Sequence, residues 1–102
     1  YIFISKEIVG SVLFDFQLDR NLKYIVINTK HPMYEYFYGL VEEQDLKDEE
    51  EPKSLTCLRI IISSWIRMEE ETSEVQREDL EEIRSRWGFI AKQIFNEIPQ
   101  NI

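Results

Sequence analysis

The residue in this chain best suited to acid–base chemistry is its single histidine, His31, which stands directly before Pro32 in the stretch VINTKHPMYEYFY. A serine hydrolase would need this histidine beside a serine and an acid, with glycines forming an oxyanion loop. The chain has no Gly-x-Ser-x-Gly sequence and only three glycines. We therefore predict no catalytic residue. We expect His31 to bond the backbone at a strand-to-helix corner, where Pro32 fixes the direction of the chain. A small hydrolase that uses His31 is kept as an alternative.

Two further groups of residues could bind a ligand. An aromatic group could stack on bases but lies among acids rather than in a basic groove, so we expect it to pack in the core or at an interface; it consists of Tyr34, Tyr36, Phe37 and Tyr38. An acidic run lacks the glycine and spacing of a calcium loop, so we expect a solvated surface; it consists of Glu42, Glu43, Asp45, Asp48, Glu49, Glu50 and Glu51. No phosphate-binding glycine loop is present. The sequence predicts no cofactor, no metal and no small-molecule ligand.

Composition limits the partners that the chain could have. A chain of 102 residues forms one domain. Its net charge of −8 argues against direct binding of nucleic acid or of an anionic membrane. No apolar run approaches the roughly 20 residues that a membrane span needs. The single Cys57 excludes an internal disulfide and suits a reducing, cytoplasmic location. Because the chain begins at Tyr1, inside an apolar run and without Met, we expect it to be a fragment of a longer protein.

The first part of the chain, residues 1–31, is expected to be rich in strands. Apolar and polar residues alternate over residues 12–18, turn-forming residues follow at 19–21, and LKYIVIN at residues 22–28 returns as a second strand. This pattern predicts an antiparallel hairpin, with residues 1–5 as a third strand and Gly10 at a bulge or bend. A short helix is expected over residues 32–44, with Pro32 at its first position and Thr29 or His31 as its cap. Residues 45–53 are expected to form an acidic loop.

The last part, residues 54–98, is expected to be a helical hairpin. Ser54 is the predicted N-cap of its first helix and Ser73, with Gln76 three residues later, that of its second helix. Each helix carries an apolar stripe that must be covered by the other helix or by the sheet; the stripes are Leu55, Leu58, Ile62 and Trp65, and Leu80, Ile83, Trp87, Ile90 and Ile94. Arg84 and Arg86 are expected on exposed faces beside acids such as Glu81 and Glu82. The predicted fold class is therefore α+β. It comprises a small antiparallel sheet of two or three strands, a short helix and an antiparallel pair of longer helices.

One segment adds a family resemblance. Residues 24–38, YIVINTKHPMYEYFY, resemble a segment downstream of the ATPase domain in bacterial proteins with an Hsp90/gyrase-type (GHKL) ATPase. The matching residues are Asn28, His31, Pro32 and Tyr34, whereas Met33 replaces the expected aromatic. The preceding VLFDFQL and the two helices after residue 54 are similar in order to that region. The ATPase motifs Glu-x-x-x-Asn-x-x-Asp and Asp-x-Gly-x-Gly are absent from this chain. The resemblance implies a C-terminal companion domain that relays nucleotide state to dimer or partner contacts.

Wide apolar stripes and a dense aromatic segment exceed what one small core needs. We therefore expect a non-catalytic interaction domain that self-associates, with a dimer favoured. Its candidate contact residues are Tyr34, Tyr38, Trp65 and Trp87. The alternative binding function is an acidic decoy that occupies a nucleic-acid-binding protein. That function would require carboxylates spread over one face, and here they cluster at residues 42–51.

Overall fold

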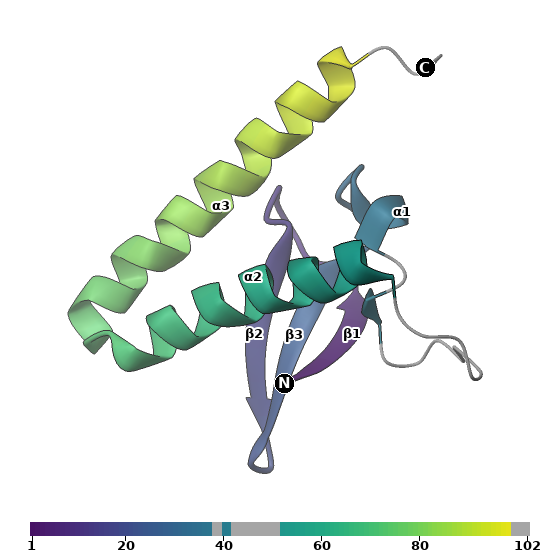
Figure 1. The fold of residues 1–102 in the computed structure, drawn as a ribbon. Helices are drawn as coiled ribbons and strands as arrows, with labels where there is room; N and C mark the ends of the chain where they lie inside the picture. Colours follow the sequence, from purple (N-terminus) through teal and green to yellow (C-terminus); the bar gives the residue numbers. More distant parts are fainter. Residues whose placement is uncertain (38–39, 42–51, 99–102) are drawn as a thin grey trace.

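The computed structural model of the chain describes residues 1–37, 40–41 and 52–98. It has the predicted α+β fold, with a three-stranded sheet, one short helix and two longer helices (Figure 1). The elements follow one another as β1 (Ile2–Lys6), β2 (Phe14–Asp19), β3 (Leu22–Asn28), α1 (Tyr34–Phe37), α2 (Lys53–Glu71) and α3 (Glu74–Glu97).

The predicted hairpin is confirmed by the pairing of β2 with β3. The two strands run antiparallel, with Phe14 opposite Ile27 and Asp19 opposite Leu22. Arg20 and Asn21 connect them with φ angles of 50° and 68°. A positive φ at both central residues is the geometry of a type I′ turn, whose twist matches that of the two strands.

The pairing of β1 differs from the antiparallel sheet that we predicted. β3 is the central strand, and β1 pairs with it in parallel, with Phe3 opposite Ile25. The reason lies in residues 7–13, which carry the chain from one edge of the sheet to the other before β2 begins. Gly10 bends this crossover with a φ of 100°. The alternation of side chains within a strand is the same in parallel and antiparallel pairs, so it gave no signal for the direction of β1.

The core lies between one face of the sheet and α2. Phe14, Ile25 and Ile27 from the sheet pack with Ile62 and Ile66 from α2. Figure 1 shows α2 crossing the sheet on this side. The apolar stripe predicted for this helix therefore covers the sheet, and its Trp65 also meets Trp87 of α3.

The two long helices meet in a tight connection. Ser73 caps α3 as predicted, since its hydroxyl accepts a hydrogen bond from the amide of Gln76 at 3.4 Å. The Arg77 side chain donates to the carbonyls of Glu69, Glu70 and Thr72 and so satisfies the free end of α2. The prediction that Ser54 caps α2 is wrong, because α2 begins at Lys53 after Pro52 and has no side-chain cap.

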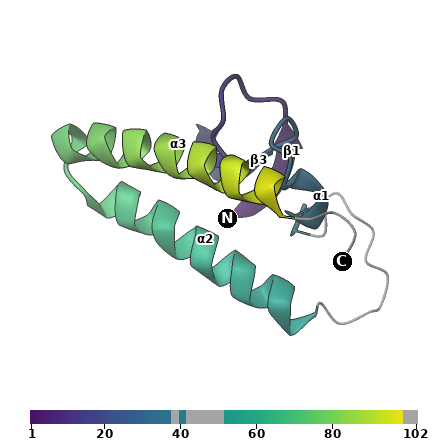
Figure 2. The same cartoon turned by 90° about the horizontal axis from the view of Figure 1, so that it is seen from above.

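Beyond this connection α2 and α3 diverge into a V (Figure 2). The apolar stripe of α3 is consequently left largely uncovered. Four of its five predicted members, Ile83, Trp87, Ile90 and Ile94, remain between 41% and 55% exposed. The face that α3 buries is formed by Arg84 and Gly88 instead.

The helix after the sheet begins later than predicted. Turns link Asn28 to His31 and His31 to Tyr34, and α1 begins only at Tyr34, so Pro32 lies in a turn rather than at the first helical position. Leu40 and Val41 are buried. Of the predicted short helix and acidic loop, residues 38–39 and 42–51 lie outside the described residues.

Candidate functional site

Asn28 holds the end of β3 against the crossover between β1 and β2. It is fully buried, and its side-chain oxygen accepts hydrogen bonds from the amides of Ile8 and Lys30, both at 3.0 Å. Its side-chain nitrogen donates to the carbonyl of Val12 at 2.7 Å. One side chain thus satisfies backbone groups on both sides of the corner, which an apolar residue of the same size could not do.

His31 joins this corner to α3. The amide of Met33 donates to Nδ1 at 3.1 Å, so Nδ1 is the acceptor and Nε2 carries the proton. Nε2 then donates to the carbonyl of Gly88 at 2.8 Å. The ring is 3% exposed. Both ring nitrogens are therefore bonded to backbone groups, in the arrangement expected for a packed corner.

Gly88 is the point at which α3 approaches the backbone of the crossover. A Cβ at this position would lie 2.4 Å from the carbonyl oxygen of Ser11 and 2.8 Å from the amide nitrogen of Leu13. No side chain fits there unless α3 moves. Sequence analysis missed this role, although an isolated glycine inside a helical pattern is a signal of close packing.

Arg84 forms a buried ionic cluster between α3, α2 and β2. Its guanidinium donates to both carboxylate oxygens of Glu69, at 2.9 and 3.1 Å, to the carbonyl of Phe14 and to the carboxylate of Asp15. The indole of Trp65 also donates to Glu69. Burial lowers the pKa of Arg84, but bonds to Glu69 and Asp15 outweigh it and leave the pKa above its usual value. The prediction that Arg84 lies on an exposed face is wrong.

The surface that opens beside these anchors is apolar. We call it the helical apolar face. It consists of Ile61, Trp65 and Met68 on α2 and Ile83, Trp87, Ile90 and Ile94 on α3. Trp65 and Trp87 meet at its centre, with ring centroids 5.8 Å apart.

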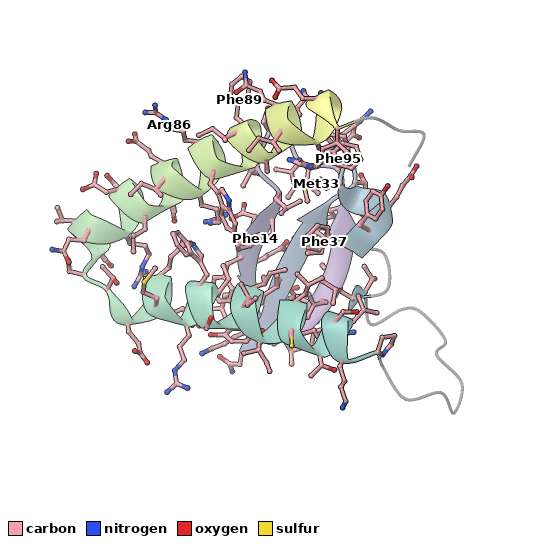
Figure 3. All side chains as sticks on the ribbon, turned by 45° about the horizontal axis from the view of Figure 1, so that its top comes forward. Phe14, Met33, Phe37, Arg86, Phe89 and Phe95 are labelled. Carbon is pink, nitrogen blue, oxygen red and sulfur yellow. The ribbon has the colours of Figure 1, made fainter. Side chains whose placement is uncertain are left out.

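A groove of about 220 Å³ continues this face toward α1; it is lined by Met33, Trp87, Ile90, Ala91, Ile94, Phe95 and Ile98. Figure 3 places Met33 and Phe95 together at its far end, where α3 passes over the corner. The ring of Tyr36 meets that of Phe95 edge-on at 5.6 Å. The groove is therefore built mainly from α3 and the residue that follows it, with Met33, just before α1, on the other side.

The four predicted contact residues have different positions. Trp87 lines the groove, and Trp65 lies beside it, half-buried. Tyr34 is half-buried against the core. Tyr38 lies outside the described residues. Sequence analysis therefore named the two tryptophans of the helical apolar face, and its helical stripes contained Ile83, Ile90 and Ile94.

The part of the chain that the structure describes offers few groups that could bind a metal or a polar ligand. No three side chains of histidine, cysteine, aspartate or glutamate come together there as a metal site. Every buried side-chain nitrogen and oxygen of these residues has a hydrogen-bond partner. None of the described helices has the length and apolarity to cross a bilayer.

Comparison with known proteins found no match. No protein-family model matches it. Neither the curated proteins nor the solved structures contain a significant match.

Proposed function

We propose that this chain is a non-catalytic interaction domain that self-associates through the helical apolar face. The observation that carries the proposal is the exposure of Ile83, Trp87, Ile90 and Ile94 on a helix that is itself firmly anchored. Contiguous apolar patches of this kind are rare on monomeric proteins and usually mark contacts with another protein. The neighbouring groove offers a second copy a concave apolar surface into which side chains can fit.

The geometry of His31 supports an interaction domain over a small hydrolase. A general base needs a free ring nitrogen within reach of the proton that it removes. In this corner Nδ1 accepts from Met33 and Nε2 donates to Gly88, so proton transfer would first require α3 to separate from the corner. The hydrolase therefore remains the weaker alternative.

The acidic decoy is also the weaker candidate. A nucleic-acid mimic needs carboxylates spread over one face, whereas α3 exposes Ile83, Trp87, Ile90 and Ile94 along one stripe. Two other expectations stay predictions: a companion role beside a GHKL-type ATPase, which rests on Asn28, His31, Pro32 and Tyr34, and a reducing, cytoplasmic location, which rests on Cys57.

Sedimentation equilibrium tests the proposal directly. We expect the wild-type chain to associate at about 100 µM, since a Kd of about 10 µM leaves most of it bound. Ile94→Glu should raise the Kd at least about tenfold, because a carboxylate would be buried without a partner. Ile60→Glu is the matched control; Ile60 is equally exposed on α2 but lies off the helical apolar face, so this variant should associate like wild type. A wild-type chain that stays monomeric, or one that Ile60→Glu and Ile94→Glu weaken equally, contradicts the proposal.

A further inference from the structure

The charges of α3 are divided between its two halves. The first half is acidic, with Glu74, Glu78, Asp79, Glu81 and Glu82. The two arginines nearest to these acids are already used inside the molecule, Arg77 on the end of α2 and Arg84 in the buried cluster. The second half carries the exposed cations Arg86 and Lys92 against one acid, Glu97.

Three of these charges border the helical apolar face. Asp79, Glu82 and Arg86 follow one another at spacings of three and four residues, which places them along one side of α3. They flank the stripe formed by Ile83, Trp87 and Ile90. Arg86 points away from the sheet (Figure 3). Any helix that covers the stripe therefore meets an acidic end and a basic end on the same flank.

We infer that the occupant of the helical apolar face is a second copy of this chain, with the two α3 helices antiparallel about a two-fold axis. The inference rests on the proposed function and adds the orientation. In this arrangement Ile83 of one copy faces Trp87 of the other, and each Glu82 lies beside an Arg86. A two-fold contact repeats every pair, so one favourable charge pair becomes two.

The parallel arrangement is disfavoured by the same charges. A parallel two-fold brings opposite flanks of the two α3 helices together, so Glu82 and Arg86 of one copy lie away from those of the other and both favourable pairs are lost. Exposed pairs contribute little affinity each. The apolar side chains therefore provide most of the affinity, and the charges choose between the two orientations.

A charge swap tests the orientation. At low ionic strength we expect Arg86→Glu to raise the dimer Kd about tenfold, because both charge pairs become repulsive. The double variant Glu82→Arg/Arg86→Glu should return the Kd to within about threefold of wild type, because it restores both pairs with reversed signs. Lys92→Glu is the matched control; it changes the net charge by the same amount but lies on another side of α3, so its effect should be smaller than that of Arg86→Glu. Circular dichroism of each variant checks that α3 stays helical.

The outcomes separate this inference from the proposed function. A monomeric wild-type chain overturns both. A dimer whose Kd is the same for wild type, Arg86→Glu and the double variant overturns the antiparallel orientation alone, since the charges at positions 82 and 86 of the two copies do not meet in a parallel pair. A double variant as weak as Arg86→Glu also overturns it. A Kd that Arg86→Glu raises about tenfold and that the double variant recovers supports it.

Discussion

α2 and α3 pack against the β-rich half of the molecule through different kinds of residue. α2 buries Ile62 and Ile66 in the core, as an amphipathic helix is expected to do. α3 turns Arg84 and Gly88 inward and leaves its isoleucines toward solvent. An apolar stripe therefore shows that a surface needs covering, while single polar or small residues can decide which face of a helix the fold itself covers.

The largest effect should come from removing the charge that anchors α3. Arg84→Ala leaves the Glu69 carboxylate buried without its main partner, and we expect it to lower the free energy of unfolding by about 3–5 kcal/mol. Arg67→Ala is the control; it breaks an exposed pair with Glu71 and should lower the free energy of unfolding far less than Arg84→Ala does. Urea unfolding followed by circular dichroism measures both.

The double variant Arg84→Met/Glu69→Leu tests whether α3 can be held by an apolar contact, as α2 is. It replaces the buried ion pair with two apolar side chains. It should be more stable than Arg84→Ala. A cost for Arg84→Ala as small as that for Arg67→Ala would show that the buried cluster does not anchor the helix.

The next effect concerns the close approach at Gly88. Gly88→Ala places a methyl group against the backbone of Ser11 and Leu13 and forces α3 outward. Overpacking of this kind costs about 1–3 kcal/mol, while alanine gains up to about 1 kcal/mol as a helix former, so a net loss of about 1–2 kcal/mol is expected.

Ser85→Ala, at an exposed position of the same helix, should change stability by no more than about 0.5 kcal/mol. Amide hydrogen exchange should show faster exchange in α3 than in α2 for Gly88→Ala, and equal protection of both helices would contradict the role of Gly88.

The smallest expected effect is a pH-dependent change in the free energy of unfolding, and it concerns Glu70 near the end of α2. Partial burial raises the pKa of Glu70, but hydrogen bonds from Tyr1 and Lys23 outweigh it and lower the pKa below its usual value. A lowered folded-state pKa stabilises the fold above the unfolded value of about 4.3, and this contribution is lost as the pH falls through the folded value.

The difference in unfolding free energy between wild type and Glu70→Gln should therefore be present at pH 7 and shrink below about pH 4. Urea titrations at both pH values measure it. A difference that is constant with pH would show that the contact does not depend on the carboxylate charge.

Sequence patterns predicted the elements well because they depend on local preferences. The antiparallel hairpin followed from turn residues between two apolar strands, and the Ser73 cap from a serine and a glutamine three residues apart. The parallel pairing of β1 could not be predicted, since it is decided by the path of residues 7–13 and not by any strand's own composition.

The candidate site was predicted only in part, and for a related reason. Trp65, Trp87 and the isoleucines of α3 were named from helical spacing. Which face of α3 the fold covers could not be predicted, because it follows from long-range contacts of Arg84 with Glu69 and of His31 with Gly88. Helical spacing carries no information about contacts between residues that lie far apart in the chain.

The contact between Trp65 and Trp87 also makes the intrinsic tryptophan fluorescence a probe of this surface. These are its only two tryptophans, and both lie where the helical apolar face would be covered. Their fluorescence therefore comes entirely from that surface. Spreading of the V would separate the two indoles, and exclusion of water by an arriving chain would shift their emission to shorter wavelength. Both events can be followed without attaching a dye.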